Sequence, residues 1–221
     1  MPTDDPRPPT LRWSRRTLLR AGLLAAAAGL PLVARGSFTP SQSEGPFFPK
    51  DPQDDTDADL TRIDGHADTA TGQAIIVSGR VLDGDGSPVD NAIIDVWHAN
   101  SYGRYNHPAD RSSAPLDPHF QGWGRLVTGT DGRYRFRTIA PGAYAASRDW
   151  QRPPHIHFKV RRSGYEDLTT QMYFSAEPLN ETDRILQALS AADREKVIVG
   201  FSEQLDGISA GRFDLVIRNT A

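Results

Sequence analysis

Short apolar runs, separated by turn residues at intervals of roughly ten residues, constrain the fold of this chain more than any other feature. From residue 74 onward they include "AIIVSGRVLD" (74–83), "AIIDVWHAN" (92–100) and "LTTQMYF" (168–174). β-Branched and aromatic residues dominate these runs, as is typical of strands. The 221 residues include 17 Pro and 19 Gly, which agrees with many turns. The pattern predicts a β-sandwich or a barrel.

We therefore predict a mainly β fold: an antiparallel β-sandwich core with long loops, an N-terminal arm and one or two short helices. Asp131-Gly132 is typical of a hairpin turn and would join 124–130 to 131–139. Residues 211–219 would add a closing strand, and 140–154 is expected to be a loop.

Helical spacing is found only in residues 181–201, where Ile185, Leu186 and Leu189 recur three to four residues apart. Ser190 could cap a second helical turn there. The predicted domains are a sandwich at 74–221, an extended arm at 37–73 anchored by two phenylalanines, and an N-terminal segment at 1–36. The two phenylalanines are Phe47 and Phe48.

The segment 1–36 resembles a twin-arginine export signal that follows a disordered start. Arg15-Arg16 precedes an uncharged run at 21–34, which is shorter than the roughly 20 residues that span a bilayer. Cleavage is expected near residues 34–36. A chance basic amphipathic helix and an uncleaved anchor are the alternatives. Export would place the protein in the periplasm, on the envelope or outside the cell, without a stable membrane span in the mature chain.

The composition of the chain limits which partners and which kinds of site it can have. The net charge of -3 gives no sign of a nucleic-acid partner. The chain has no cysteine, which excludes disulfides, thiolate nucleophiles and cysteine-based metal sites. A metal would have to be held by histidine, carboxylate or tyrosine.

Two of the six histidines lie one residue apart in "RPPHIHFKV" (152–160). In a strand, His155 and His157 point to the same face and lie about 6–7 Å apart at the backbone. They could converge on one metal ion, or they could be hydrogen-bonded histidines in a core or an interface. The prolines Pro153 and Pro154 suggest that this end of the strand lies at an edge or leaves the sheet.

Further ligands would be needed for a mononuclear site, and no Asp or Glu accompanies the histidine pair. Tyr105 and Tyr144 lie in turn-rich segments, and a tyrosinate is a hard donor that favours a ferric ion. Taken singly, each tyrosine is better explained as an ordinary core or surface aromatic residue than as a ligand.

From about residue 43 to residue 219 the chain resembles the intradiol ring-cleaving dioxygenases, most closely the protocatechuate 3,4-dioxygenase branch and its β-chain type. Six blocks occur in the family's order: "EGPFFP", "NAIIDVWHANSYGRYNHPAD", "APLDPHFQGWGR", "TDGRYRFRTIAPGAY", "WQRPPHIHFKV" and "LTTQMYF". One departure is that the segment between Tyr144 and His155 is slightly shorter than in the protocatechuate enzymes, so the substrate entrance is expected to differ.

The resemblance implies one non-haem Fe(III) ion per chain, with the ligands Tyr105, Tyr144, His155 and His157. Tyr144 would be the ligand that leaves when substrate binds. The resemblance also implies that Arg152 and Gln171 flank the substrate ring. The reaction would insert both atoms of O2 into a catechol-type ring between its vicinal hydroxyls and give a cis,cis-muconate.

The remaining histidines are expected to have ordinary roles. His98 is predicted to pack or to support the site, and His66 to be solvated. His107 could line the pocket near Tyr105, and Trp150 could be core or pocket wall.

Two alternatives stay open at this point: a non-catalytic β-sandwich binding module that keeps only the scaffold, and a zinc or copper enzyme that uses the two histidines. Formation of a homo-oligomer also stays open.

Overall fold

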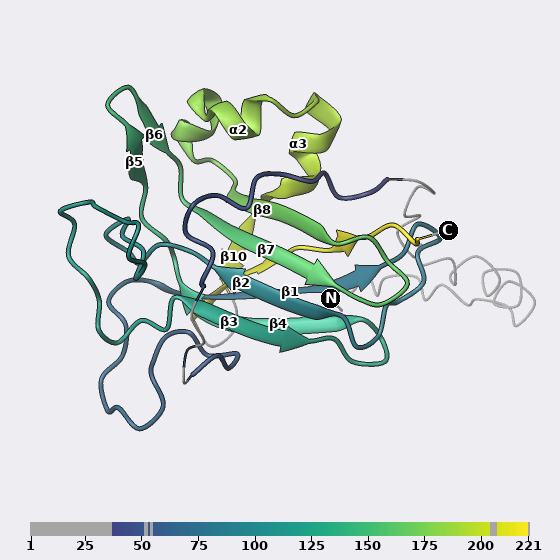
Figure 1. Ribbon diagram of the computed structural model, residues 1–221, viewed down its shortest axis with the longest axis horizontal. Coiled ribbons are helices and arrows are strands. Elements are labelled where there is room, and N and C mark those ends of the chain that lie inside the picture. The colour runs from purple at the N-terminus through teal and green to yellow at the C-terminus, as the bar shows by residue number, and fades with distance from the viewer. Residues whose placement is uncertain (1–36, 51–52, 54, 204–206, 221) are drawn as a thin grey trace, which may run out of the picture. The chain divides into compact units, whose positions relative to one another are not determined.

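The computed structural model describes residues 37–50, 53, 55–203 and 207–220, which belong to one compact unit (Figure 1). The predicted export signal at 1–36 lies outside the described residues. Within these residues, no helix combines the length and the apolar character needed to cross a membrane.

Two five-stranded sheets form the described structure (Figure 1). The first contains β1 (Ala74–Leu82), β4 (Arg133–Ile139), β10 (Phe201–Glu203), β11 (Ser209–Arg212) and β12 (Leu215–Val216). The second has the order β3 (Trp123–Val127), β2 (Ile93–Trp97), β7 (His155–Arg161), β8 (Leu168–Phe174) and β9 (Ile198–Val199). The mainly β, sandwich-like prediction is confirmed, although the pairing is mixed. β1 pairs in parallel with β11 and β12, and β8 pairs in parallel with β9.

The inner faces of the two sheets share one apolar core. Ile156, Phe158 and Val160 of β7 alternate into this core and are fully buried. The Phe158 ring contacts Phe136 on β4 at 6.0 Å and Phe213 at 5.0 Å between ring centroids. Each such buried aromatic side chain contributes about 2–3 kcal/mol by its removal from water. The strict alternation along β7 leaves its other face free to carry polar groups.

Two details differ from the sequence prediction. The strands on either side of Asp131-Gly132 do not form a hairpin: β3 pairs with β2, whereas β4 pairs with β1 in the other sheet. The turn itself is present, because Gly132 has φ +72° and its N–H donates to the Gly129 carbonyl at 2.9 Å. Local turn chemistry thus fixes the reversal of the chain but not the sheet that the next strand joins. The predicted closing strand is also divided into β11 and β12.

The segment expected to be a loop contains a small hairpin, β5 (Tyr144–Ser147) and β6 (Trp150–Arg152), outside the two main sheets. The helical prediction is confirmed in η1 (Pro178–Thr182), α2 (Arg184–Gln187) and α3 (Ala191–Val197), but its last residues are wrong, since they form β9 and the start of β10. Ser190 caps α3, as predicted, and accepts from the Asp193 N–H at 3.1 Å. β7 begins directly after the two prolines and lies in the middle of its sheet, so the prolines mark a strand start and not an edge.

Candidate metal centre

His155 and His157 lie on the outer face of β7, opposite the core-facing Ile156. Both are 2% exposed, and their ring centroids are 4.9 Å apart. The two-residue period of the strand therefore produces the shared direction that the sequence predicted.

Two tyrosine rings complete the group. Tyr105 lies in the loop after β2, where its backbone N–H donates to the Asp110 carboxylate at 2.8 Å. Tyr144 opens the β5–β6 hairpin. The Tyr105 and Tyr144 ring centroids are 5.6 Å apart, Tyr144 lies 5.7 Å from His155, and Tyr105 lies 6.4 Å from His157. Residues from three separate segments thus form a closed cycle of four neighbouring rings.

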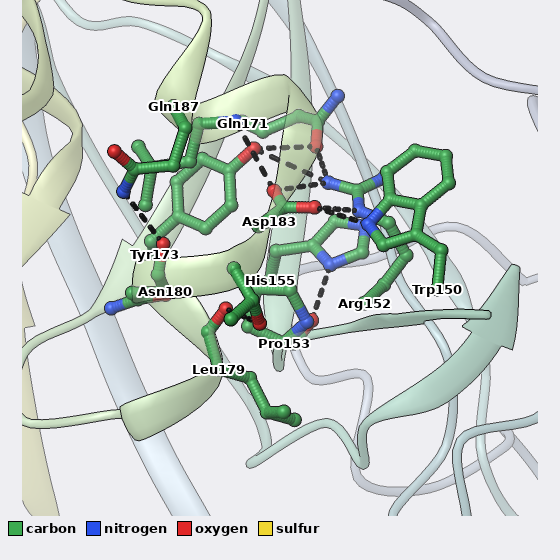
Figure 2. Close-up of polar contacts among 12 residues, drawn as sticks. Trp150, Arg152, Pro153, His155, Gln171, Tyr173, Leu179, Asn180, Asp183 and Gln187 are labelled. Carbon is green, nitrogen blue, oxygen red and sulfur yellow. Dashed lines mark hydrogen bonds and ion pairs between the residues drawn. The ribbon is translucent and has the colours of Figure 1, made fainter.

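The hydrogen bonds of His155 define which of its nitrogens could bind a metal. Its Nδ1 donates to the Pro153 carbonyl at 2.6 Å (Figure 2). Because a carbonyl oxygen can only accept, Nδ1 carries the proton and Nε2 of the neutral ring carries a lone pair. That Nε2 is buried and has no partner among the described residues. A protonated Nδ1 bonded to backbone oxygen, with a free Nε2, is the arrangement found in metal-binding histidines.

His157 also has a ring nitrogen that lacks a hydrogen-bond partner. Its ring stacks on Trp97 at 4.7 Å, and its Nδ1 is buried without a hydrogen-bond partner in the described part of the chain. Burial, reinforced by the nearby Arg152 cation, holds the pKa of both His155 and His157 well below the usual histidine value. Both rings are therefore neutral at ordinary pH, which is the form that binds metals.

The hydroxyl of Tyr105 is also poorly satisfied. The Tyr105 oxygen is buried and has no partner at hydrogen-bond geometry among the described residues. Burial raises the pKa of Tyr105 well above its usual value, and the neighbouring Tyr144 raises it further. Burial also raises the pKa of Tyr144, although the Arg152 guanidinium offsets part of that effect. Both phenols stay protonated unless a nearby cation stabilises their anions.

A ferric ion fits this set of donors. Buried polar atoms are normally hydrogen-bonded, so several unpartnered ones at one place need an explanation. Here they are a phenol oxygen and imidazole nitrogens on neighbouring rings, and the hard phenolate donors favour a hard, highly charged ion.

The N-terminal arm covers this centre. Phe47 stacks on Tyr105 with ring centroids 4.4 Å apart, and Gly45 lies against the His157 ring. Gln42 accepts from the Gln171 backbone N–H at 3.0 Å and donates to the Tyr173 hydroxyl at 3.2 Å. Figure 1 shows the arm crossing the second sheet near β8. The arm thus belongs to the wall of the site, which sequence reasoning indicated only by the anchoring role given to Phe47 and Phe48.

Figure 2 shows Arg152 and Gln171 in contact near the His155 ring. The Arg152 Nη2 donates to the Gln171 Oε1 at 2.7 Å and to the Tyr173 hydroxyl at 3.2 Å. Asp183 accepts from the Arg152 Nε at 2.8 Å and is fully buried. Sequence reasoning missed Tyr173 and Asp183, because nothing in a polar "ETDR" segment indicates that one of its carboxylates is buried.

The other predicted residues have clear positions. His98 is satisfied on both nitrogens and is not positioned as a ligand. His107 packs against Phe47, with ring centroids 5.9 Å apart, at the edge of the group. Trp150 donates from Nε1 to Asp183 at 3.2 Å and lies beside the Arg152 guanidinium. His66 is exposed, as expected.

Comparisons with known proteins agree with this arrangement. A family model described as "Dioxygenase" matches residues 43–219. The protocatechuate 3,4-dioxygenase beta chain of Burkholderia cepacia is 44% identical over 171 residues, which cover 73% of this chain and 72% of that relative. The chain belongs to the intradiol dioxygenase family.

Other intradiol dioxygenases are more distant. Catechol 1,2-dioxygenase 1 of Acinetobacter lwoffii is 32% identical over 186 residues, covering 78% of this chain and 56% of that relative. The chain therefore spans little more than half the length of the catechol 1,2-dioxygenase.

Among solved structures, the dioxygenase domain of a dioxygenase–carbohydrate-binding fusion from Streptomyces sp. SirexAA-E aligns with a TM-score of 0.63 and 29% identity. The alignment covers 83% of this chain and 99% of that domain. A 3-chlorocatechol 1,2-dioxygenase from Rhodococcus opacus 1CP shares the fold at a TM-score of 0.65 and 23% identity, covering 85% of this chain and 76% of that chain.

Proposed function

We propose that this protein binds one ferric ion through Tyr105, Tyr144, His155 and His157. We further propose that it cleaves a catechol-type ring between its vicinal hydroxyls, inserting both atoms of O2 to give a cis,cis-muconate. Its enzyme class, an intradiol ring-cleaving dioxygenase, follows from its family. The observation that carries the metal assignment is the closed cycle of four rings with unpartnered ligand atoms.

When bound, a ferric ion supplies Lewis acidity that draws electron density from a chelated catecholate and prepares its ring for reaction with O2. The protein side chains must do the rest: accept the protons of the catechol, hold the ring and limit access of water.

Tyr144 is suited to accept a substrate proton. It is the only member of the four that lies on the small β5–β6 hairpin, and it is less buried than the other three. Because burial raises its pKa, the phenolate of Tyr144 takes up a proton readily once it is displaced from a cation. Displacement by the catechol would thus couple substrate binding to removal of one of the substrate protons.

Tyr105 is suited to stay in place. Its ring is 4% exposed, is stacked on Phe47 and is attached through its backbone to Asp110. The two histidines are fixed by the central strand β7. These three side chains would hold the substrate complex while Tyr144 moves.

Arg152 is positioned to stabilise negative charge that develops on the ring and its oxygens. Its side chain is 4% exposed, so its charge is little screened by water. Gln171 accepts one of its hydrogen bonds and orients the guanidinium. The aromatic side chains Phe47 and Trp97, together with the arm, would exclude water from the same space.

The direct test is O2 uptake by the iron-loaded protein with catechol, protocatechuate and hydroxyquinol, together with ultraviolet detection of the ring-cleaved product. We expect one O2 to be consumed per ring cleaved for at least one of the three compounds. A fully iron-loaded protein that consumes no O2 with any of them would favour the non-catalytic binding module.

Export by the twin-arginine route is the second part of the proposal, and it is supported by the Arg15-Arg16 pair and the uncharged run behind it. It would place the enzyme in the periplasm, on the envelope or outside the cell. Replacing Arg15 and Arg16 by lysine in the full chain should leave the protein in the cytoplasm, as measured by cell fractionation. Unchanged export of that variant would contradict the assignment.

A further inference from the structure

Asp183 has no role in the proposed chemistry so far, yet it is the most completely enclosed charge beside the metal centre. Its side chain is 0% exposed, and both of its oxygens are used. Oδ1 accepts from the Arg152 Nε at 2.8 Å and from the Trp150 Nε1 at 3.2 Å. Oδ2 accepts from the Arg152 Nη2 at 3.2 Å and from the Leu186 N–H at 3.2 Å.

These contacts fix the plane of the Arg152 guanidinium. A bidentate arginine–carboxylate pair sets both distance and orientation, in contrast to a single contact. The same Nη2 also reaches Gln171 and Tyr173 on β8, so Arg152 is held on two sides (Figure 2). These bonds use Nε and Nη2, and the guanidinium also lies within hydrogen-bonding reach of Tyr144, the ligand expected to move.

Asp183 also balances a charge that would otherwise oppose metal binding. Arg152 pairs across the β5–β6 hairpin with Tyr144 and lies three residues before His155, so its cation is next to two of the proposed ligands. At that place it would repel a ferric ion. A buried carboxylate in direct contact with the guanidinium offsets this repulsion.

The carboxylate further connects two elements around the site. It caps the N-terminus of α2, bonds Trp150 on β6 and pairs with Arg152 at the end of the same strand. The β5–β6 hairpin also carries Tyr144, the ligand expected to move. Asp183 therefore holds β6 in place, directly across from the β5 residue Tyr144, which pairs with Arg152 in the hairpin.

We propose that Asp183 is a positioning residue for ring cleavage: it orients Arg152 toward the substrate and neutralises its charge so that the ferric ion can bind next to it. This inference rests on the proposed function. The competing explanation is that Asp183 only stabilises the fold as a helix cap.

The test compares Asp183→Asn with the wild type in the iron-loaded protein. Asparagine keeps the size and an acceptor oxygen for the cap but removes the charge. Because residues that support metal ligands and their neighbours typically account for 10–100-fold effects, we expect kcat to fall by about 10–100-fold with a smaller change in KM. We also expect loss of iron to a chelator to be about 10-fold faster. Asp183→Glu should restore part of both values.

Asp193→Asn is the matched control. Asp193 lies in the first turn of α3, where it accepts from Ser190 and Lys196 and does not contact Arg152. It should change thermal stability but neither kcat nor iron retention. If Asp183→Asn lowers stability as Asp193→Asn does and leaves kcat and iron retention unchanged, Asp183 is only a helix cap.

A double variant separates the two explanations further. If Asp183 acts through Arg152, then Arg152→Gln combined with Asp183→Asn should lose no more kcat than Arg152→Gln alone. Losses that multiply would overturn the inference. If the wild type cleaves no catechol, the proposed function and this inference both fail. If the wild type cleaves catechol and Asp183→Asn has the same kcat and iron retention, only the inference fails.

Discussion

The residues just after β2 and the outer face of β7 both bury histidine, but they use the ring nitrogens differently. His98 contacts the Ala99 carbonyl through Nδ1 and the Thr138 hydroxyl on β4 through Nε2, each at 2.7 Å. His155 and His157 each leave a buried nitrogen without a partner among the described residues. All three are 1–2% exposed, so burial alone does not separate them. Their hydrogen bonds do separate them. A histidine whose two ring nitrogens both have partners supports the fold, whereas one with an unpartnered nitrogen is available to a metal.

The largest effect should come from removing a histidine of each kind. His157→Ala is expected to lower ferric affinity by at least about 100-fold, because a direct ligand is lost. His98→Ala should keep the iron but lose about 2–4 kcal/mol of unfolding free energy, since it leaves buried groups unpaired and creates a cavity. Iron analysis and denaturant unfolding measure the two effects. The comparison fails if His98→Ala loses iron and His157→Ala does not.

The same contrast applies to two buried tyrosines. Tyr134 donates its hydroxyl to the Phe213 carbonyl, whereas the Tyr105 hydroxyl has no such partner in the described structure. Tyr105→Phe is expected to abolish ring cleavage with little change in the stability of the metal-free protein. Tyr134→Phe should cost about 1–2 kcal/mol of stability and leave cleavage intact. O2 uptake and thermal unfolding would show whether the effects divide in this way.

The pH dependence of stability sharpens the comparison at His98. Burial lowers the pKa of His98 to about 4 from its ordinary value of 6.5. The unfolded chain therefore binds the proton first as pH falls, so the contribution of neutral His98 is fully present above pH 6.5 and is lost between about pH 6.5 and pH 4. The expected loss is about 3 kcal/mol.

Denaturant unfolding of the metal-free protein across this range should show a shallower pH dependence for His98→Gln than for the wild type. The burial of His155 and His157, the largest cause of their lowered pKa values, is common to both proteins, so its contribution cancels in the difference. Identical pH dependence in the two proteins would remove the charge-based account of His98.

The smallest effect concerns the arm that covers the ligands. Gly45 has φ +72°, and a Cβ there would lie 3.5 Å from the His157 Cε1. Gly65 has φ +79°, and a Cβ there would meet nothing within 4 Å. Alanine at either position should cost about 1–2 kcal/mol, because a side chain disfavours this backbone region. Only Gly45→Ala should also change kcat, by a few-fold, and equal kcat in the two variants would remove Gly45 from the site.

Much of the scaffold could be predicted because its signals are local. The strand at 168–174 was predicted with the bounds that β8 has, and the shared face of His155 and His157 follows from strand periodicity. The Asp131-Gly132 turn was also visible, but the choice of sheet on either side of it depends on long-range pairing. The β5–β6 hairpin was missed because its residues carry little strand preference.

The candidate site was predictable only in part. Residue type and spacing made the two histidines and the two tyrosines candidates only. The resemblance to a family assigned them as ligands and added Arg152 and Gln171. Asp183 and Tyr173 were missed, since the burial of a polar side chain depends on packing between distant segments. Their contacts with Arg152 appear only when α2, β6 and β8 are brought together.

The visible absorption spectrum of the iron-loaded protein tests the central claim most directly. If Tyr105 and Tyr144 bind a ferric ion together with His155 and His157, the protein should be burgundy from tyrosinate-to-iron charge transfer. The band should change in Tyr144→Phe, and turnover should be impaired in the same variant. A protein that holds one ferric ion per chain but shows no visible band, or whose band and kinetics are unchanged in Tyr144→Phe, would contradict the account.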